Sequence, residues 1–202
     1  MSPWPHEKFF IITGSEGAGK TTLSEALSRR GFQVMVESTR EVWKHQARIG
    51  GPFLPFAGGS EAERRTYFEL ALSWDLRSYD AALALNNSGP VIFDRAVIDN
   101  IIFLKFSGLS VPAHLDRAAR QHPFNPTVFL APFWPAIYTR DPERTSSPEE
   151  ASAQEEICRE VYESYGYRLV RLPLAGPEER AEFAIRHIKL DLAVREAVRD
   201  FL

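Results

Sequence analysis

The sequence predicts an α/β fold in which a mostly parallel sheet is covered by helices on both faces. Short apolar runs alternate with longer segments of helical periodicity along the whole chain, and this alternation is typical of parallel sheets. At 202 residues, the chain is long enough to bury a full core. No internal repeat, low-complexity tract or composition break divides it, so we expect a single domain over residues 1–202.

The predicted strands are short apolar runs bounded by turn or polar residues. The turn Asn87-Ser88-Gly89-Pro90, for example, leads directly into the apolar run Val-Ile-Phe. The strands expected from this pattern cover residues 9–13, 33–36, 91–93, 127–130 and 168–172.

The segments between the strands carry helix signals. Residues 21–30 have an amphipathic pattern, and Gly31 follows as a helix-ending residue. After the second strand, Ser38 or Thr39 could cap a helix, and Pro177 stands at a favourable first-turn position. Further helices are expected over about 61–86, from about 148, and from 177 to about 200.

Residues 14–21 have the sequence GSEGAGKT, a complete match to the phosphate-binding pattern G-x-x-x-x-G-K-[ST]. An apolar strand precedes the loop and a helix follows it, so glycine-rich backbone N–H groups and a helix N-terminus face one anion. We expect Lys20 to reach the β- and γ-phosphates of a nucleoside triphosphate, and the Thr21 hydroxyl to ligate Mg²⁺. The residues expected to bind the nucleotide here are Gly14, Ser15, Glu16, Gly17, Ala18, Gly19, Lys20, Thr21 and Thr22.

Ligands of such sheets bind beyond the carboxyl ends of the strands. That rule predicts one cleft ringed by Gly14, Glu37, Asp94, Ala131-Pro132 and Pro173. Three of these five positions carry phosphate-loop or acidic chemistry, which agrees with a nucleotide site.

Asp94 ends the third strand, and Arg95 follows it. A carboxylate at that place can hold Mg²⁺, directly or through its water shell, opposite Thr21. The guanidinium of Arg95 suits a phosphate or a polar substrate. The alternative is that Asp94 caps the next helix and Arg95 is a solvated surface charge.

Glu37 ends the second strand, and Arg40 lies about one turn into the following helix. A carboxylate at this position can accept the proton of a substrate hydroxyl as that hydroxyl attacks a γ-phosphate. Arg40 could contact the substrate or the transferred phosphate. The alternative is a capped helix with Arg40 as a solvated charge and Trp43 in the core.

A third charged cluster lies at about 138–150 and includes Arg140 and Arg144. Phosphoryl transfer needs cations on the developing charge and exclusion of water, and an arginine-bearing lid supplies both. The alternative is an ordinary charged surface loop whose arginines pair with neighbouring acids.

Composition excludes several classes of protein. The net charge is −3, with 24 basic and 27 acidic residues, so a global footprint for nucleic acid is absent. The five histidines show no ligand-like spacing, and Cys158 falls in a helical pattern that indicates a buried structural thiol. With neither a signal-peptide pattern nor an apolar run of membrane-spanning length, we expect a cytoplasmic protein.

The segments GSEGAGKTT, VESTREVW, VIFDRAVIDN, IYTRDPER and YGYRLVRLP, in that order, resemble the P-loop kinases. More narrowly, they are similar to the AAA-28-type group of predicted ATPases and kinases, which is similar to ribosylnicotinamide kinase domains and more distantly to nucleoside and thymidylate kinases. The resemblance implies a three-layer α-β-α fold with sheet order 2-3-1-4-5, ATP and Mg²⁺ at the loop, and a lid around Arg140 and Arg144. It also implies that adenine lies near Pro173 and Gly176. The lid lacks a dense arginine run, which leaves the acceptor open.

The function expected from these observations is transfer of the γ-phosphoryl group of ATP to a hydroxyl of a small, nucleoside-like acceptor. Trp43, Phe53 and Phe56 could line an acceptor pocket or pack in the core. One alternative is a regulatory ATPase that acts as a switch without an acceptor. Another is a polynucleotide 5′-hydroxyl kinase that uses a local site at residues 64–68, although the near-neutral charge argues against it. Apolar residues at 111–126 could form a homodimer surface, with packing of a loop on its own core as the simpler account.

Overall fold

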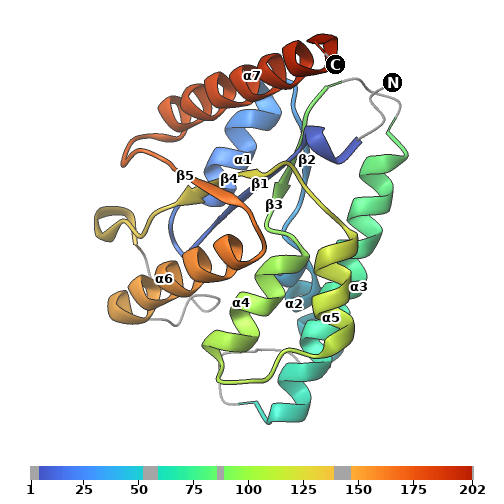
Figure 1. Ribbon diagram of the computed structural model, residues 1–202. Coiled ribbons are helices and arrows are strands. Elements are labelled where there is room, and N and C mark those ends of the chain that lie inside the picture. The colour runs from blue at the N-terminus through green and yellow to red at the C-terminus, as the bar shows by residue number, and fades with distance from the viewer. Residues whose placement is uncertain (1–4, 52–58, 86–88, 139–146, 202) are drawn as a thin grey trace.

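A five-stranded parallel sheet forms the centre of the molecule (Figure 1). The computed structural model describes residues 5–51, 59–85, 89–138 and 147–201. The sheet order is β2-β3-β1-β4-β5, which confirms the order implied by the family resemblance. The strands are β1 (Phe9–Gly14), β2 (Gln33–Met35), β3 (Val91–Asp94), β4 (Thr127–Ala131) and β5 (Arg168–Arg171).

Helices cover both faces of the sheet, as the alternating pattern predicts (Figure 1). One face packs against α1 (Lys20–Arg29) and α7 (Pro177–Phe201). The other face packs against α2 (Ser38–Ile49), α3 (Glu61–Leu83), α4 (Val97–Phe106), α5 (Ala113–Gln121) and α6 (Pro148–Ser164). Two short 3-10 turns, η1 (Pro5–Lys8) and η2 (Pro135–Ile137), complete the described elements.

The central strand β1 is buried on both sides, which explains its unbroken apolar sequence. Phe9 and Ile11 belong to the larger core under α2–α6, whereas Phe10 and Ile12 belong to the core under α1 and α7. This alternation follows from the two-residue period of a strand. Because β1 pairs with both β3 and β4, its carboxyl end lies in the middle of the sheet edge.

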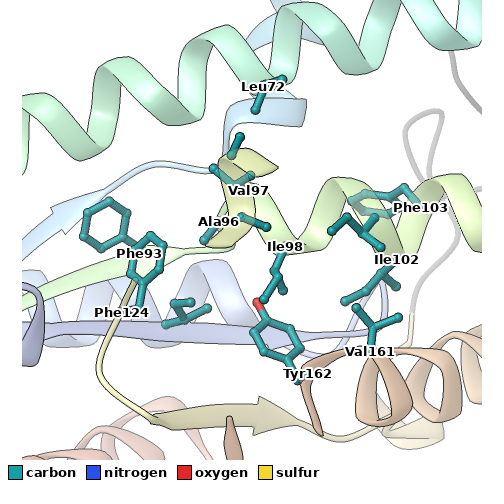
Figure 2. Packing of buried hydrophobic residues seen from close by; sticks show 14 of the residues in the cluster. Leu72, Phe93, Ala96, Val97, Ile98, Ile102, Phe103, Phe124, Val161 and Tyr162 are labelled. Atoms are coloured by element: carbon teal, nitrogen blue, oxygen red, sulfur yellow. The ribbon is translucent and has the colours of Figure 1, made fainter. Parts of the chain in front are cut away.

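The larger core contains the helix that the sequence pattern did not reveal. Residues 97–104 of α4 are all buried, and Figure 2 shows Val97, Ile98, Ile102 and Phe103 among residues of neighbouring elements. A helix that is buried on every side lacks the polar face on which helical periodicity depends. The pattern therefore resembled an apolar run without a period.

The stretch at 111–126 also differs from the sequence-based expectation. It forms α5 rather than a loop, and Leu115, Ala118 and Phe124 are buried in the chain's own core. These residues are therefore covered within the chain, which agrees with the simpler account that the stretch packs on its own core; a homodimer stays a prediction. Cys158 is buried, as predicted. Within the described part of the chain, no helix is both long and apolar enough to cross a membrane.

Candidate active site

The glycine-rich loop connects β1 to α1, in the structural context that the motif requires. β1 ends at Gly14 and α1 begins at Lys20. Gly14, Gly17 and Gly19 have φ angles of 133°, 69° and 77°, which residues with a Cβ rarely adopt. A backbone of this kind allows successive N–H groups to point at one anion.

Among the three positive-φ glycines of the loop, Gly14 is the one where an added side chain fits least. A Cβ added there would overlap the carbonyl oxygen of Ala131 in the adjacent strand β4. We expect Gly14→Ala to lower the free energy of unfolding by about 3 kcal/mol or more, from positive-φ strain and overpacking together. Chemical denaturation measures this loss.

Gly166→Ala is the matched control for that substitution. Gly166 also has a positive φ of 84°, but a Cβ there meets nothing within 4 Å. It should therefore cost only about 1 kcal/mol. Equal losses at Gly14 and Gly166 would show that close approach of β4 does not constrain the loop.

Lys20 is held within the loop by its own backbone. The Nζ atom donates hydrogen bonds to the carbonyl oxygens of Gly14 (3.1 Å) and Ser15 (2.7 Å). Burial lowers the pKa of Lys20 to about 8, and the charge of Arg95 acts in the same direction. An anion beside the ammonium would favour its charged form, so the electrostatics suit a phosphate at this loop.

Asp94 contacts the N-terminal part of α1 through Ser24. Its Oδ2 accepts a hydrogen bond from the Ser24 hydroxyl (3.2 Å), while its buried Oδ1 has no hydrogen-bond partner among the described residues. Burial raises the pKa of Asp94 to about 6, and the charge of Glu37 adds to this rise.

The residues around Asp94 and Thr21 can be compared with what Mg²⁺ requires of its ligands. No group of three or more His, Cys, Asp or Glu side chains in the described ranges could hold a metal by itself. A buried carboxylate oxygen without a partner, together with the Thr21 hydroxyl, matches instead an ion that takes most of its ligands from phosphate and water. The residues present therefore fit Mg²⁺ bound with a nucleotide.

The raised pKa of Asp94 has a consequence for stability. The folded protein binds this proton more tightly than the unfolded chain, so the Asp94 charge weakens the fold as pH rises from about 4 to above 6. We expect Asp94→Asn to stabilise the protein above pH 6 by at most about 3 kcal/mol, with the gain disappearing near pH 4. Thermal unfolding of both proteins across this pH range measures the difference.

Asp116→Asn serves as the control, because the pKa of Asp116 is lowered whereas that of Asp94 is raised. Hydrogen bonds from Arg120 and Tyr165 lower the pKa of Asp116, so removing its charge should not stabilise the fold. A melting temperature for Asp94→Asn below that of the parent at every pH would contradict the account of Asp94.

Glu37 and Arg95 form an ion pair at the carboxyl edge of β2 and β3. Arg95 Nε lies 2.9 Å from Glu37 Oε1, but its N–H is not aligned for a hydrogen bond. The Thr39 hydroxyl donates to the same oxygen (2.8 Å). Burial alone would raise the pKa of Glu37, but the charges of Arg95 and Lys20 outweigh it and lower the pKa below its ordinary value. Glu37 is therefore a carboxylate at neutral pH.

Arg95 is fixed by its backbone as well as by its partners. Among the described residues, Arg95 is the one residue other than glycine with a positive φ, at 67°. Its backbone N–H donates a hydrogen bond to the carbonyl oxygen of Ile12 (2.9 Å). The guanidinium lies over the ring of Phe103, 4.8 Å from its centroid. A strained residue at this edge agrees with a functional role rather than with a solvated surface charge.

Asp99 is a residue of this site that the sequence reasoning missed. Its two carboxylate oxygens accept hydrogen bonds from Thr13 (2.6 Å), Tyr162 (2.6 Å), Arg95 (3.3 Å) and the N–H of Ala96 (2.9 Å). It thereby links β1, α4 and α6 behind Arg95. Its position in the first turn of α4 was the available signal, but that helix was not recognised.

The N-terminal turn of α2 brings Arg40 to the phosphate loop. Arg40 Nη1 lies 3.5 Å from the Thr21 hydroxyl. Neither Ser38 nor Thr39 caps α2 through its side chain, since Glu37 itself occupies the N-cap position. Trp43 packs against the larger core, and its buried Nε1 has no partner among the described residues. Four predicted site residues lie outside the described residues: Phe53, Phe56, Arg140 and Arg144.

Arg180 of α7 connects the phosphate loop to the segment after β5. It donates from Nη1 to the carbonyl oxygen of Ala18 (2.6 Å) and from Nε to that of Pro173 (2.8 Å), and its own N–H donates to Gly176 (3.0 Å). The indole of Trp134 lies 5.1 Å from the guanidinium. Pro173 and Gly176, predicted to lie near adenine, are thus tied to the loop by a residue that the sequence did not single out.

A phosphate-binding loop at the carboxyl edge of a parallel sheet in this order defines a P-loop α/β protein. The chain belongs to the AAA domain family, whose model matches residues 9–180. The family resemblance seen in the sequence is thereby confirmed. No curated protein matches the sequence.

Several solved structures share this fold. A deoxyadenosine kinase from M. mycoides with dCMP and dCDP bound is 16% identical, with a TM-score of 0.63 over 90% of this chain and 98% of that chain. NadR in complex with NR is 18% identical, with a TM-score of 0.61 over 90% of this chain and 50% of that chain. Shikimate kinase from Acinetobacter baumannii is 16% identical, with a TM-score of 0.54 and 92% of each chain covered. At these identities the likeness establishes the fold.

Proposed function

We propose that this protein transfers the γ-phosphoryl group of ATP to a hydroxyl group of a small acceptor. The observation that carries the proposal is the closeness of a carboxylate base to the phosphate loop. Glu37 is the N-cap residue of α2, and Arg40 in the first turn of that helix reaches the Thr21 hydroxyl. The charges of Glu37 and Asp94 also act on Lys20. Donor and acceptor chemistry therefore share one edge of the sheet.

Glu37 acts as the general base. Its carboxylate takes the proton of the acceptor hydroxyl while the acceptor oxygen bonds to the γ-phosphorus and the bond to the β–γ bridging oxygen breaks. The products are a phosphate monoester and ADP. Because Thr39 and Arg95 both engage Oε1, they fix the carboxylate in place during this transfer. Arg95 also offers positive charge beside the reacting groups.

Lys20 and the loop backbone stabilise negative charge on the β- and γ-phosphates. Thr21 and Asp94 would hold Mg²⁺, which neutralises charge on these oxygens when it is bound. Asp99 does not touch the reacting groups; it positions Arg95 through the 3.3 Å contact to Nη1.

A small acceptor is favoured over a polynucleotide. Tyr67 and Phe68, the aromatic residues of the alternative site, are 3% and 1% exposed and offer no face for base stacking. Arg65 is already paired with Glu61 at 2.8 Å, and Arg64 donates to the carbonyl oxygen of Gly59. The solved structures that share the fold include a deoxyadenosine kinase with dCMP bound, a shikimate kinase with shikimate and NadR with NR, all of which hold small molecules.

The proposal is tested by measuring ADP release from Mg·ATP in the presence of nucleosides, ribosylated pyridines, shikimate-like cyclic acids, sugars and 5′-hydroxyl oligonucleotides. A class of small acceptors should raise the rate well above the basal rate, with little dependence on salt. Stimulation by oligonucleotides alone, falling steeply with salt, would overturn the small-acceptor proposal. A basal rate that no acceptor raises would favour a regulatory ATPase.

A further inference from the structure

The outer face of α7 carries large apolar side chains that are exposed in the described part of the chain. Leu190, Val194, Val198 and Phe201 are 64%, 54%, 54% and 94% exposed. They recur every three or four residues, so they share one face of the helix. Figure 1 shows α7 along the outside of the molecule, beside α1. Scattered exposed apolar residues are ordinary, but a continuous row on one helix indicates an interface.

The opposite face of α7 fixes which way this row points. Ile188 is buried, and Leu192 packs against the same core. Arg195 lies 2.6 Å from Asp191 and 3.6 Å from Glu7 of η1. Asn125 donates to Asp191 (2.7 Å). These contacts anchor the C-terminal half of α7, so the apolar row cannot turn inward to the chain's own core.

The row has the spacing of a helix-pairing seam. His187, Leu190, Val194, Ala197 and Phe201 stand at alternating steps of three and four residues, which is the pattern of two helices that pack at a small angle. His187 is half-buried against Phe129 and Phe183 at the inner end of this seam, and Val198 lies beside the seam. On one flank, Arg186, Ala193 and Asp200 recur every seven residues, and all three are exposed. This flank therefore has a basic end, a small residue at its middle and an acidic end.

We propose that this face pairs with the same face of a second copy of the chain, with the two α7 helices antiparallel. An antiparallel two-fold pair brings like flanks together in reverse order. Arg186 then faces Asp200 of the partner subunit, and Asp200 faces the partner's Arg186. Ala193 lies at the two-fold axis, where its small side chain permits close approach. Leu190 faces the partner's Val194.

The charges on the flank of α7 favour a second copy of the chain as the partner and an antiparallel orientation of the two helices. In a parallel pair, the residue facing Arg186 would be Asp191 of the partner subunit, and Asp191 is already engaged by Arg195, Asn125 and Thr127 within its own chain. The antiparallel pair instead uses charges that are exposed on the flank. Two α7 helices that overlap over residues 183–201 share a length of about 28 Å. The area buried by one helix from each chain is small for a specific protein interface. The dimer should therefore dissociate on dilution.

The first test is the oligomeric state measured by sedimentation over a range of concentrations. The parent protein should form a reversible dimer, and Val194→Glu should be a monomer at the same concentrations. Arg186→Glu or Asp200→Arg alone should weaken the dimer by roughly tenfold. The double variant Arg186→Glu with Asp200→Arg should restore it, because both symmetry-related pairs are then reversed.

The second test reports the geometry directly. Ala193→Cys should be joined to its partner by a short bismaleimide, whereas Glu196→Cys, exposed on the same helix but off the seam, should not. The parent protein is the reagent control because Cys158 is buried. A parent protein that stays monomeric, a dimer that survives Val194→Glu, or equal cross-linking of the two cysteine variants would overturn the proposal. None of these outcomes depends on the proposed phosphoryl transfer.

Discussion

Replacing Glu37 with Gln should slow phosphoryl transfer by about 10²–10⁴-fold while leaving the affinity for Mg·ATP nearly unchanged. The amide keeps the size of the side chain and can still contact Thr39, but it cannot accept the acceptor's proton. Arg95 keeps its contact with Asp99, so its charge is not left without a partner. Rates with an identified acceptor and equilibrium binding of a non-hydrolysable ATP analogue measure the two effects separately.

Glu41→Gln is the matched control for Glu37→Gln. Glu41 lies one turn further along α2, and its side chain pairs with Lys44 at 2.8 Å. The same chemical change at that position should leave the rate of transfer within about twofold of the parent, as for a surface ion pair. Full activity of Glu37→Gln would remove Glu37 from the mechanism.

Replacing Lys20 with Met should weaken ATP binding and reduce the rate of transfer by about 10²–10³-fold. The expected contact of the ammonium is with the β- and γ-phosphates, so AMP affinity should change little. Because burial disfavours the charged form of Lys20, the loss of that charge should not lower the melting temperature. Titrations with ATP and AMP, together with thermal unfolding, check each expectation.

The ratio of ATP to AMP affinity decides the interpretation of the Lys20→Met result. A role at the phosphates predicts that this ratio falls sharply. Equal losses for ATP and AMP with a lower melting temperature would instead indicate a general defect of the loop, and unchanged ATP binding would contradict the assignment of the loop.

The position of the candidate nucleotide loop in the fold could be predicted because its motif is encoded in contiguous residues. The loop pattern at 14–21 stands between an apolar strand and a helix, and both were found where expected. Asp94 and Glu37 could be proposed as site residues because each ends a predicted strand, and parallel strands bring their carboxyl ends to one edge. The strand order came from the family resemblance rather than from periodicity.

The residues that hold the site together could not be found in this way. Asp99 contacts Thr13 across 86 positions of the chain, and Arg180 contacts Ala18 across 162. No local pattern specifies such contacts, since they exist only after the sheet has formed. The helix α4 could not be predicted for a related reason. It is buried on every side, so its sequence lacks the polar face by which an amphipathic helix is recognised.

The destination of the γ-phosphoryl group tests the central claim most directly. ATP labelled at the γ-phosphate is incubated with the protein, Mg²⁺ and each acceptor class, and the products are separated from inorganic phosphate. The account predicts label in a phosphate monoester of a small acceptor, formed by the parent protein and by Glu41→Gln but strongly reduced in Glu37→Gln. Label found in inorganic phosphate alone, at a rate independent of every acceptor and of Glu37, would contradict it.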